Sequence, residues 1–210
     1  ISMLNYYYSD TIKSFLNKST EEVIGSITLS NYFDSTLNQN KAWEQQILIL
    51  QTALHGFDGT LYFEFSIPRM GKRIDCLLII EQVVFVIEFK VGETQYLKFN
   101  EDQVWDYALD LKNFHKPSHA AVIVPVLVAT DAEDTLAKIV TTSHDDNLIR
   151  PIRTNKYGVK NIIEKTLEWF SDEARVDHIE YANGSYSPTP TIIEAAVSLF
   201  NNHNVDAITR

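Results

Sequence analysis

The segment from residue 73 to residue 90 constrains the fold of this chain more than any other part of it. Two almost continuous apolar stretches are separated there only by Glu81-Gln82. Apolar runs of this length are typical of buried strands, and a two-residue break between them is typical of a tight hairpin turn. With the turn at Glu81-Gln82, Ile80 faces Val83. The sequence therefore predicts an antiparallel hairpin that is apolar along most of its length.

Two acids and a lysine interrupt the apolar pattern at one end of this hairpin. The same register places Asp75 opposite Glu88, with their Cβ atoms about 5 Å apart, and the two-residue period of a strand puts Lys90 on the same face. Facing carboxylates destabilise a strand pair unless something lies between them. A hard divalent cation such as Mg²⁺ is the natural occupant, because it prefers carboxylate oxygens. Such an ion lowers the pKa of bound water and offsets charge developing on a phosphate oxygen, and Lys90 would orient that water or pair with the phosphate.

Hydrophobic spacing on either side of the hairpin predicts a mixed α/β fold. An amphipathic helix that stops at His55-Gly56 is indicated by apolar residues at helical spacing, namely Trp43, Ile47, Leu50 and Leu54. The other expected elements are strands at 60–67, 73–80, 83–90, 121–129 and 148–152, and helices at 103–114, at 159–170 and from residue 189 onwards. An order of helix, three strands, helix and strand is typical of a central mixed sheet flanked by helices.

Length, cysteine content and hydropathy exclude several classes of protein. The 210 residues fit one domain with a sizeable core and an appendage, and the single cysteine, Cys76, excludes an intrachain disulfide. No apolar run approaches the roughly 18 residues that span a bilayer, and the N-terminus lacks the basic and then apolar pattern of a signal peptide. These features predict a cytoplasmic protein with no membrane partner.

The overall charge of the chain differs from the local charge near Asp75. With 18 Lys and Arg against 28 Asp and Glu, the formal net charge is -10. An acidic balance argues against unselective coating of nucleic acid, which depends on clustered basic residues. Arg69, Lys72 and Arg73 nevertheless gather just before Asp75. We expect these three side chains to contact nucleic-acid phosphates, and a turn kept soluble by its charge is the alternative.

The motifs around the hairpin resemble those of the PD-(D/E)XK nuclease superfamily. Asp75, a spacer and Glu88-Phe89-Lys90 follow a helix that contains Trp43-Glu44, and Gln103-Val-Trp-Asp-Tyr107 matches the Gln-x-x-x-Tyr motif of one subset. The one departure is Ile74, where the superfamily nominally has proline before the acid. Residues 67–75 and 104–115 also resemble the N-terminal region of bacterial Schlafen-like DNA/RNA helicases, in which a nuclease-like domain precedes a P-loop ATPase.

The resemblance implies a restriction-endonuclease-like core (α-β-β-β-α-β) and a metal site. Asp75 and Glu88 would bind Mg²⁺ or Mn²⁺, and the Phe89 carbonyl would be a further ligand. Lys90 would activate or position water.

Three further residues receive roles from the same resemblance. Glu44 would orient or assist a metal-bound water, whereas its ordinary explanation is helix propensity and the helix dipole. Gln103 and Tyr107 would hold the active-site edge or the scissile strand, since a separation of four places them on one helical face. Glu64, between Phe63 and Phe65, faces either the site or solvent, and the sequence does not decide between the two.

The resemblance also implies a division of the chain and an activity. Residues 1–39 are expected to form an N-terminal extension packed on the core, 40–180 the nuclease-like domain, and 181–210 a C-terminal helix and linker toward a helicase/ATPase domain of the same full-length protein. The expected activity is Mg²⁺-dependent endo- or exonucleolytic hydrolysis, of DNA in preference to RNA. Two alternatives stay open, a catalytically inactive module that grips nucleic acid and a domain that binds a basic protein partner.

Overall fold

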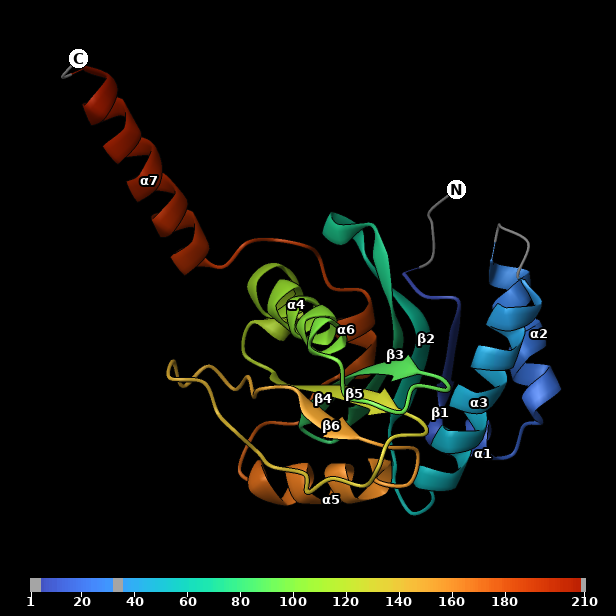
Figure 1. Cartoon of the computed structure of the whole chain (residues 1–210). Helices are drawn as coiled ribbons and strands as arrows, with labels where there is room; N and C mark the ends of the chain where they lie inside the picture. The colour runs from blue at the N-terminus through green and yellow to red at the C-terminus, as the bar shows by residue number, and fades with distance from the viewer. Residues whose placement is uncertain (1–4, 32–35, 209–210) are drawn as a thin grey trace.

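The structure, a computed structural model, describes residues 5–31 and 36–208, with side chains as far as Asn201. Parts of the expected N-terminal extension, residues 1–4 and 32–35, lie outside the described residues. The fold is α/β, with a six-stranded mixed sheet in the order β1-β2-β3-β4-β5-β6 (Figure 1). Strands β1 to β4 are antiparallel, and β5 and β6 run parallel to β4. Their bounds are β1 (Tyr8–Thr11), β2 (Thr60–Ile67), β3 (Lys72–Ile80), β4 (Val83–Lys90), β5 (Val122–Ala129) and β6 (Ile152–Thr154).

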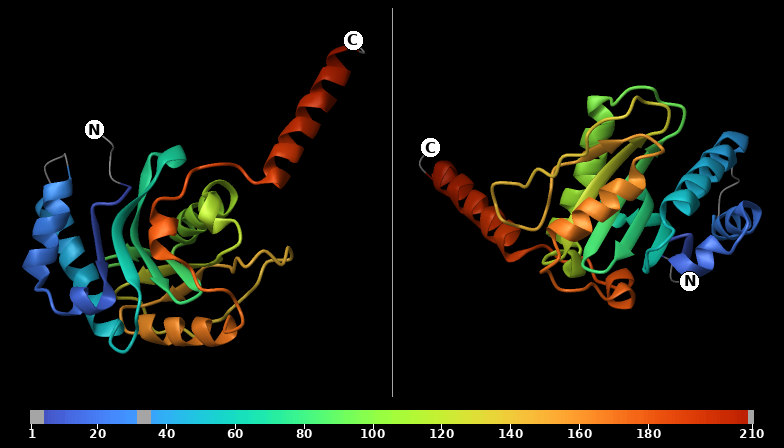
Figure 2. Two further views of the ribbon diagram at one scale, coloured as in Figure 1. Left: turned by 180° about the vertical axis from the view of Figure 1, so that it is seen from behind. Right: turned by 90° about the horizontal axis from the view of Figure 1, so that it is seen from below.

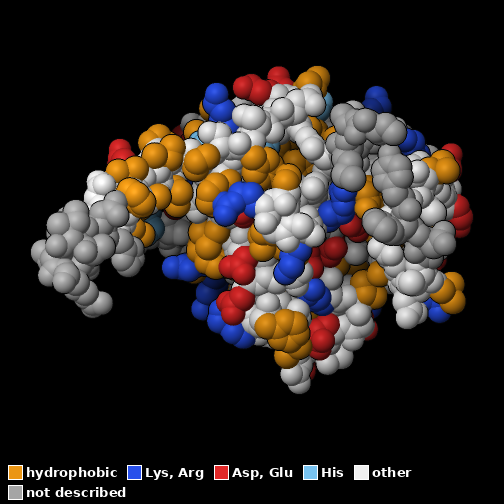
Figure 3. All heavy atoms as spheres, turned by 90° about the horizontal axis from the view of Figure 1, so that it is seen from above, with side chains coloured by type: hydrophobic (Ala, Val, Ile, Leu, Met, Phe, Trp, Pro, Cys, Tyr) orange, Lys and Arg blue, Asp and Glu red, His pale blue; other side chains and the backbone are white. Residues whose placement is uncertain are grey.

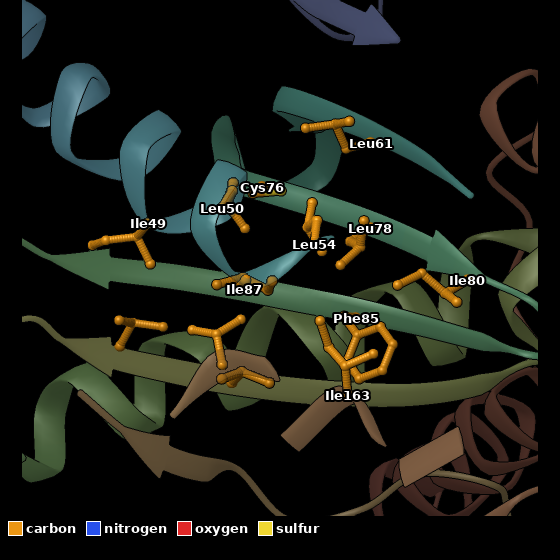
Figure 4. Close-up of a cluster of buried hydrophobic side chains, with 14 of the residues drawn as sticks. Ile49, Leu50, Leu54, Leu61, Cys76, Leu78, Ile80, Phe85, Ile87 and Ile163 are labelled. Carbon is orange, nitrogen blue, oxygen red and sulfur yellow. The ribbon is translucent and has the colours of Figure 1, made fainter. Parts of the chain in front are cut away.

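Helices cover both faces of the sheet. On one face α3 and α5 share a buried cluster with the strands (Figure 4). Buried residues of α1 and α2 belong to the same cluster. On the other face α4 and α6 pack over a second cluster. The helix α7 extends away from this body (Figures 1 and 2). The helical bounds are α1 (Ile12–Leu16), α2 (Thr20–Ser30), α3 (Leu37–Ala53), α4 (Lys98–Phe114), α5 (Val159–Trp169), α6 (His178–Ala182) and α7 (Pro190–Ile208), with short 3-10 turns η1 (Pro68–Met70) and η2 (Lys116–Ser118).

The predicted hairpin is confirmed, including its register. Ile80 pairs with Val83 and Cys76 with Ile87. Gln82 in the turn is buried, and its Nε2 donates a hydrogen bond to the Leu167 carbonyl at 3.0 Å. This bond connects the turn to α5. The hairpin is therefore held both by the ladder between β3 and β4 and by a side-chain hydrogen bond at its turn.

The strand expected at 148–152 lies further along the chain. Leu148 makes only an isolated bridge with Ile123, and β6 begins at Ile152. Two features delay the strand: Asn147 has a left-handed backbone with φ of 55°, and Pro151 has no N–H to give to a ladder. Within the described ranges, no helix is long and apolar enough to cross a membrane.

In the hairpin β2–β3, the side chains of one pair of facing residues lie on the opposite face of the sheet from that expected for regular strands. Phe63 pairs with Cys76, and both belong to the cluster under α3. Two residues further on, Phe65 pairs with Ile74, and both belong to the cluster under α4. A regular strand would keep these residues on one face. The inversion coincides with Glu64, whose φ is 57°, a conformation that non-glycine residues rarely adopt.

Candidate active site

An open cleft of about 410 Å³ lies where α3 passes the ends of the central strands. Three carboxylates enter it from three adjacent strands, Glu64 from β2, Asp75 from β3 and Glu88 from β4. The register on either side places Glu64 across from Asp75, and Asp75 across from Glu88. The full lining is Gln39, Ala42, Trp43, Gln46, Glu64, Asp75, Glu88, Phe89, Lys90, Val91 and Glu93.

Asp75 and Glu88 lie together at the floor of the cleft. Asp75 Oδ2 accepts the Phe89 N–H at 2.8 Å, so the side chain inserts where the ladder between β3 and β4 ends. Glu88 is 4% exposed, and its Oε2 has no hydrogen-bond partner among the described residues. Burial, reinforced by the charge of Glu88, raises the pKa of Asp75 well above its usual range. Burial also raises the pKa of Glu88, and the contacts of its carboxyl group with Lys90 and Asp75 oppose this shift.

A hydrogen-bonded chain holds Lys90 beside this pair. Lys90 Nζ donates to Glu88 Oε1 and to Gln103 Oε1, each at 2.9 Å. Gln103 Nε2 in turn donates to the Tyr107 hydroxyl at 2.6 Å. Tyr107 is buried, and that burial raises its pKa to about 12, so the hydroxyl stays protonated. The residues expected to form the site on β4 and α4 are therefore brought together, and the helix residues fix the lysine.

Glu64 is a third acid of the cleft that the sequence left undecided. Its Oε1 accepts the Trp43 indole N–H at 3.0 Å, and its main-chain carbonyl accepts from Arg73 Nη1 at 2.6 Å. Burial raises the pKa of its carboxyl group. The left-handed backbone of Glu64 is held from two sides, by α3 and by β3, which is typical of strain kept at functional sites.

Glu44, expected on sequence grounds to assist a water, is exposed and does not line the cleft. Successive helical residues point about 100° apart, and on α3 it is Trp43 that turns inward. Gln46 lines the cleft as well, and its buried Oε1 has no partner among the described residues. The structure thus brings Trp43 and Gln46 from α3 to the cleft and leaves Glu44 outside it.

The three basic residues of the hairpin tip do not share one surface. The Arg69 guanidinium lies 3.4 Å from the centre of the Phe114 ring and 3.9 Å from an Asp110 oxygen. Lys72 is exposed. Arg73 stacks at 4.0 Å over Tyr7, on the side of Glu64. On the face seen in Figure 3, basic and acidic side chains are interspersed rather than gathered in one basic field.

The carboxylates at the floor of the cleft are suited to a hard cation that keeps several waters, and not to an ion whose ligands all come from the protein. In the part of the chain that the structure describes, no group of three or more His, Cys, Asp or Glu is arranged to hold a metal ion. Mg²⁺ commonly uses one or two carboxylates and keeps several waters. The unpartnered Oε2 of Glu88 beside Asp75 fits that mode, because a cation would satisfy the orphaned oxygen and offset the charges of both acids.

Comparison with protein-family models, curated proteins and solved structures yields no match to this chain.

Proposed function

We propose that this chain is a metal-dependent nuclease domain that hydrolyses phosphodiester bonds, DNA in preference to RNA. The observation that carries the proposal is the unpartnered, buried Glu88 Oε2 beside Asp75, with Lys90 locked against the same carboxylate. Structural acids are seldom left in this state, because an unsatisfied buried charge costs free energy. A cation-binding role for these acids explains why the chain keeps an unpartnered carboxylate oxygen in this position.

The order of elements around the cleft supports a restriction-endonuclease-like core as part of the proposal. The helix α3 precedes the antiparallel strands β2, β3 and β4, and α4 then crosses over to the parallel strand β5. The acids come from β3 and β4, and the Gln-x-x-x-Tyr pair comes from α4. This order, and the presence of the acids on β3 and β4 and of the Gln-x-x-x-Tyr pair on α4, support the proposed core, whereas Glu44 on α3 does not line the cleft.

The chemistry follows from the residues of the cleft. Asp75, Glu88 and the Phe89 carbonyl would hold Mg²⁺ or Mn²⁺, and the bound ion would lower the pKa of water and offset charge on the phosphate. An ammonium has three donors, and two of those of Lys90 are used by Glu88 and Gln103. Its third N–H is left to donate to a phosphate oxygen. Water oxygen bonds to phosphorus as the bond from phosphorus to the leaving oxygen breaks.

Cleavage assays test this proposal directly. Labelled single-stranded and duplex DNA, and RNA of the same sequence, are incubated with the protein in Mg²⁺, in Mn²⁺ or in EDTA. We expect products in either divalent ion and none in EDTA. Binding without products in every condition would make the chain an inactive nucleic-acid module, whereas neither binding nor cleavage at low salt would favour a protein-interaction domain. ATP hydrolysis and duplex unwinding by the full-length protein test the proposed helicase/ATPase partner domain.

The exposed Lys72 provides a test of the substrate-binding surface. A phosphate contact contributes nearly one released counterion, so Lys72→Gln should weaken DNA binding in EDTA and lower the slope of log affinity against log salt by about 1. Lys160→Gln, an exposed lysine on α5, is the matched control and should leave both quantities unchanged. Fluorescence anisotropy at several salt concentrations measures both. Equal behaviour of the two variants would remove Lys72 from the binding surface.

A further inference from the structure

Hydrolysis by the proposed nuclease needs a group that takes a proton from the attacking water. Asp75 and Glu88 are committed to the cation in the proposed function. Lys90 is held as a donor to two oxygens, and an ammonium has no lone pair to accept a proton. These three residues are therefore not candidates for the proton acceptor, and the other polar groups of the cleft are.

Two further carboxylates line the cleft, and they differ in how they are held. Glu93 is only partly buried, and its Oε1 accepts the N–H of the next residue, Thr94, at 3.2 Å. Glu64 is directed into the cleft by a left-handed backbone, and its Oε1 is fixed by the Trp43 indole at 3.0 Å. Glu64 is also the acid that lies across from Asp75 in the strand register.

The contacts of Glu64 leave one oxygen for a water. The indole N–H occupies Oε1 from the side of α3, and the Arg73 guanidinium holds the main-chain carbonyl rather than the carboxylate. Among the described residues no hydrogen bond is made to Oε2, so this oxygen can accept a hydrogen bond from water within the cleft. A fixed carboxylate with one free oxygen is the arrangement that a general base requires, because geometry decides whether proton transfer is possible.

We propose that Glu64 is the general base of the cleft, an inference that rests on the proposed nuclease function. One O–H bond of the attacking water breaks and its proton passes to Glu64 Oε2, while the water oxygen bonds to phosphorus. The bond between phosphorus and the leaving oxygen breaks, and that oxygen takes a proton from solvent. Glu64 then releases its proton to solvent, so the enzyme returns to its starting state.

The variant Glu64→Gln tests this role while keeping an oxygen acceptor for Trp43. We expect kcat to fall by about 100-fold or more and KM to change by less than about twofold. Binding of Mn²⁺ alone, followed by electron paramagnetic resonance, should keep its affinity, because Glu64 is not a ligand in this proposal. Glu164→Gln, at an exposed position on α5 outside the cleft, is the matched control and should cleave like the unaltered protein. In Glu64→Ala, added formate should restore part of kcat, which a structural defect would not allow.

The outcomes separate failure of the general-base role of Glu64 from failure of the proposed nuclease function. If the unaltered protein cleaves nothing in Mg²⁺ or Mn²⁺, the nuclease proposal fails and the role of Glu64 fails with it. If it cleaves and Glu64→Gln cleaves at a similar rate, the nuclease proposal survives and the general base is wrong. Loss of Mn²⁺ binding in Glu64→Gln would make Glu64 a metal ligand and would also overturn the inference.

Discussion

Asp75→Asn and Glu88→Gln should each lower the rate of cleavage by about 1000-fold or more, without loss of stability in EDTA. The loss of activity follows from removing a charged ligand whose cation supplies most of the electrostatic stabilisation at phosphorus. Stability should hold or rise because burial raises the pKa of both acids, so the ionised forms oppose folding at neutral pH. The charge of Glu88 adds to the shift at Asp75, and the charge of Glu64 adds to the shift at Glu88. The Asn side chain also keeps an acceptor for the Phe89 N–H.

Thermal unfolding with and without Mn²⁺ separates this explanation from simple damage to the fold. A ligand at 100 times its dissociation constant stabilises the folded protein by about 2.7 kcal/mol. For a chain of this size that is a rise in Tm of roughly 5–10 °C. We expect the rise in the unaltered protein and not in Asp75→Asn. If either variant unfolded at a clearly lower temperature than the unaltered protein in EDTA, the view that the two acids destabilise the metal-free fold would be wrong.

The hairpin and its acids could be predicted because they depend on local periodicity. Apolar runs that flank Glu81-Gln82 leave one register that buries both strands, and that register alone brings Asp75 to Glu88. The four-residue separation of Gln103 and Tyr107 similarly determines that they share a face of α4. What the spacing could not show is that the Gln103 amide would bridge Lys90 to the tyrosine hydroxyl.

Glu64 shows where periodicity fails as a guide. Alternation predicts that Phe63 and Phe65 share a face and that Glu64 points away from both. The positive φ of Glu64 places the two rings in different clusters, and no residue preference at this position signals such a conformation. The contacts that stabilise it come from Trp43, more than twenty residues earlier, and from Arg73 across the hairpin. Tertiary contacts of this kind are invisible to a pattern read along the chain.

A buried histidine that follows α4 should make the stability of the fold depend on pH. It lies on the opposite side of the sheet from α3. His115 Nδ1 lies 2.7 Å from Ser118 Oγ, which lies 2.6 Å from the Tyr181 hydroxyl. The imidazole also packs against the rings of Phe65, Tyr181 and Tyr186. The cluster joins η2 and α6 to the hairpin β2–β3, so its state affects how firmly the hairpin tip is held.

His115 should make the folded chain less stable as the pH falls from 6.5 to 4. Burial lowers the pKa of His115 from 6.5 to about 4. Between these values the unfolded chain binds a proton that the folded chain does not, so stability decreases as the pH falls through this window. A shift of this size corresponds to about 3 kcal/mol at the lower end. His115→Phe, which keeps a packed ring, should lose this dependence, and urea unfolding across the window measures it. The difference between the two curves isolates His115, because the acids of the cleft are common to both proteins; parallel curves would show that the histidine does not titrate as its burial requires.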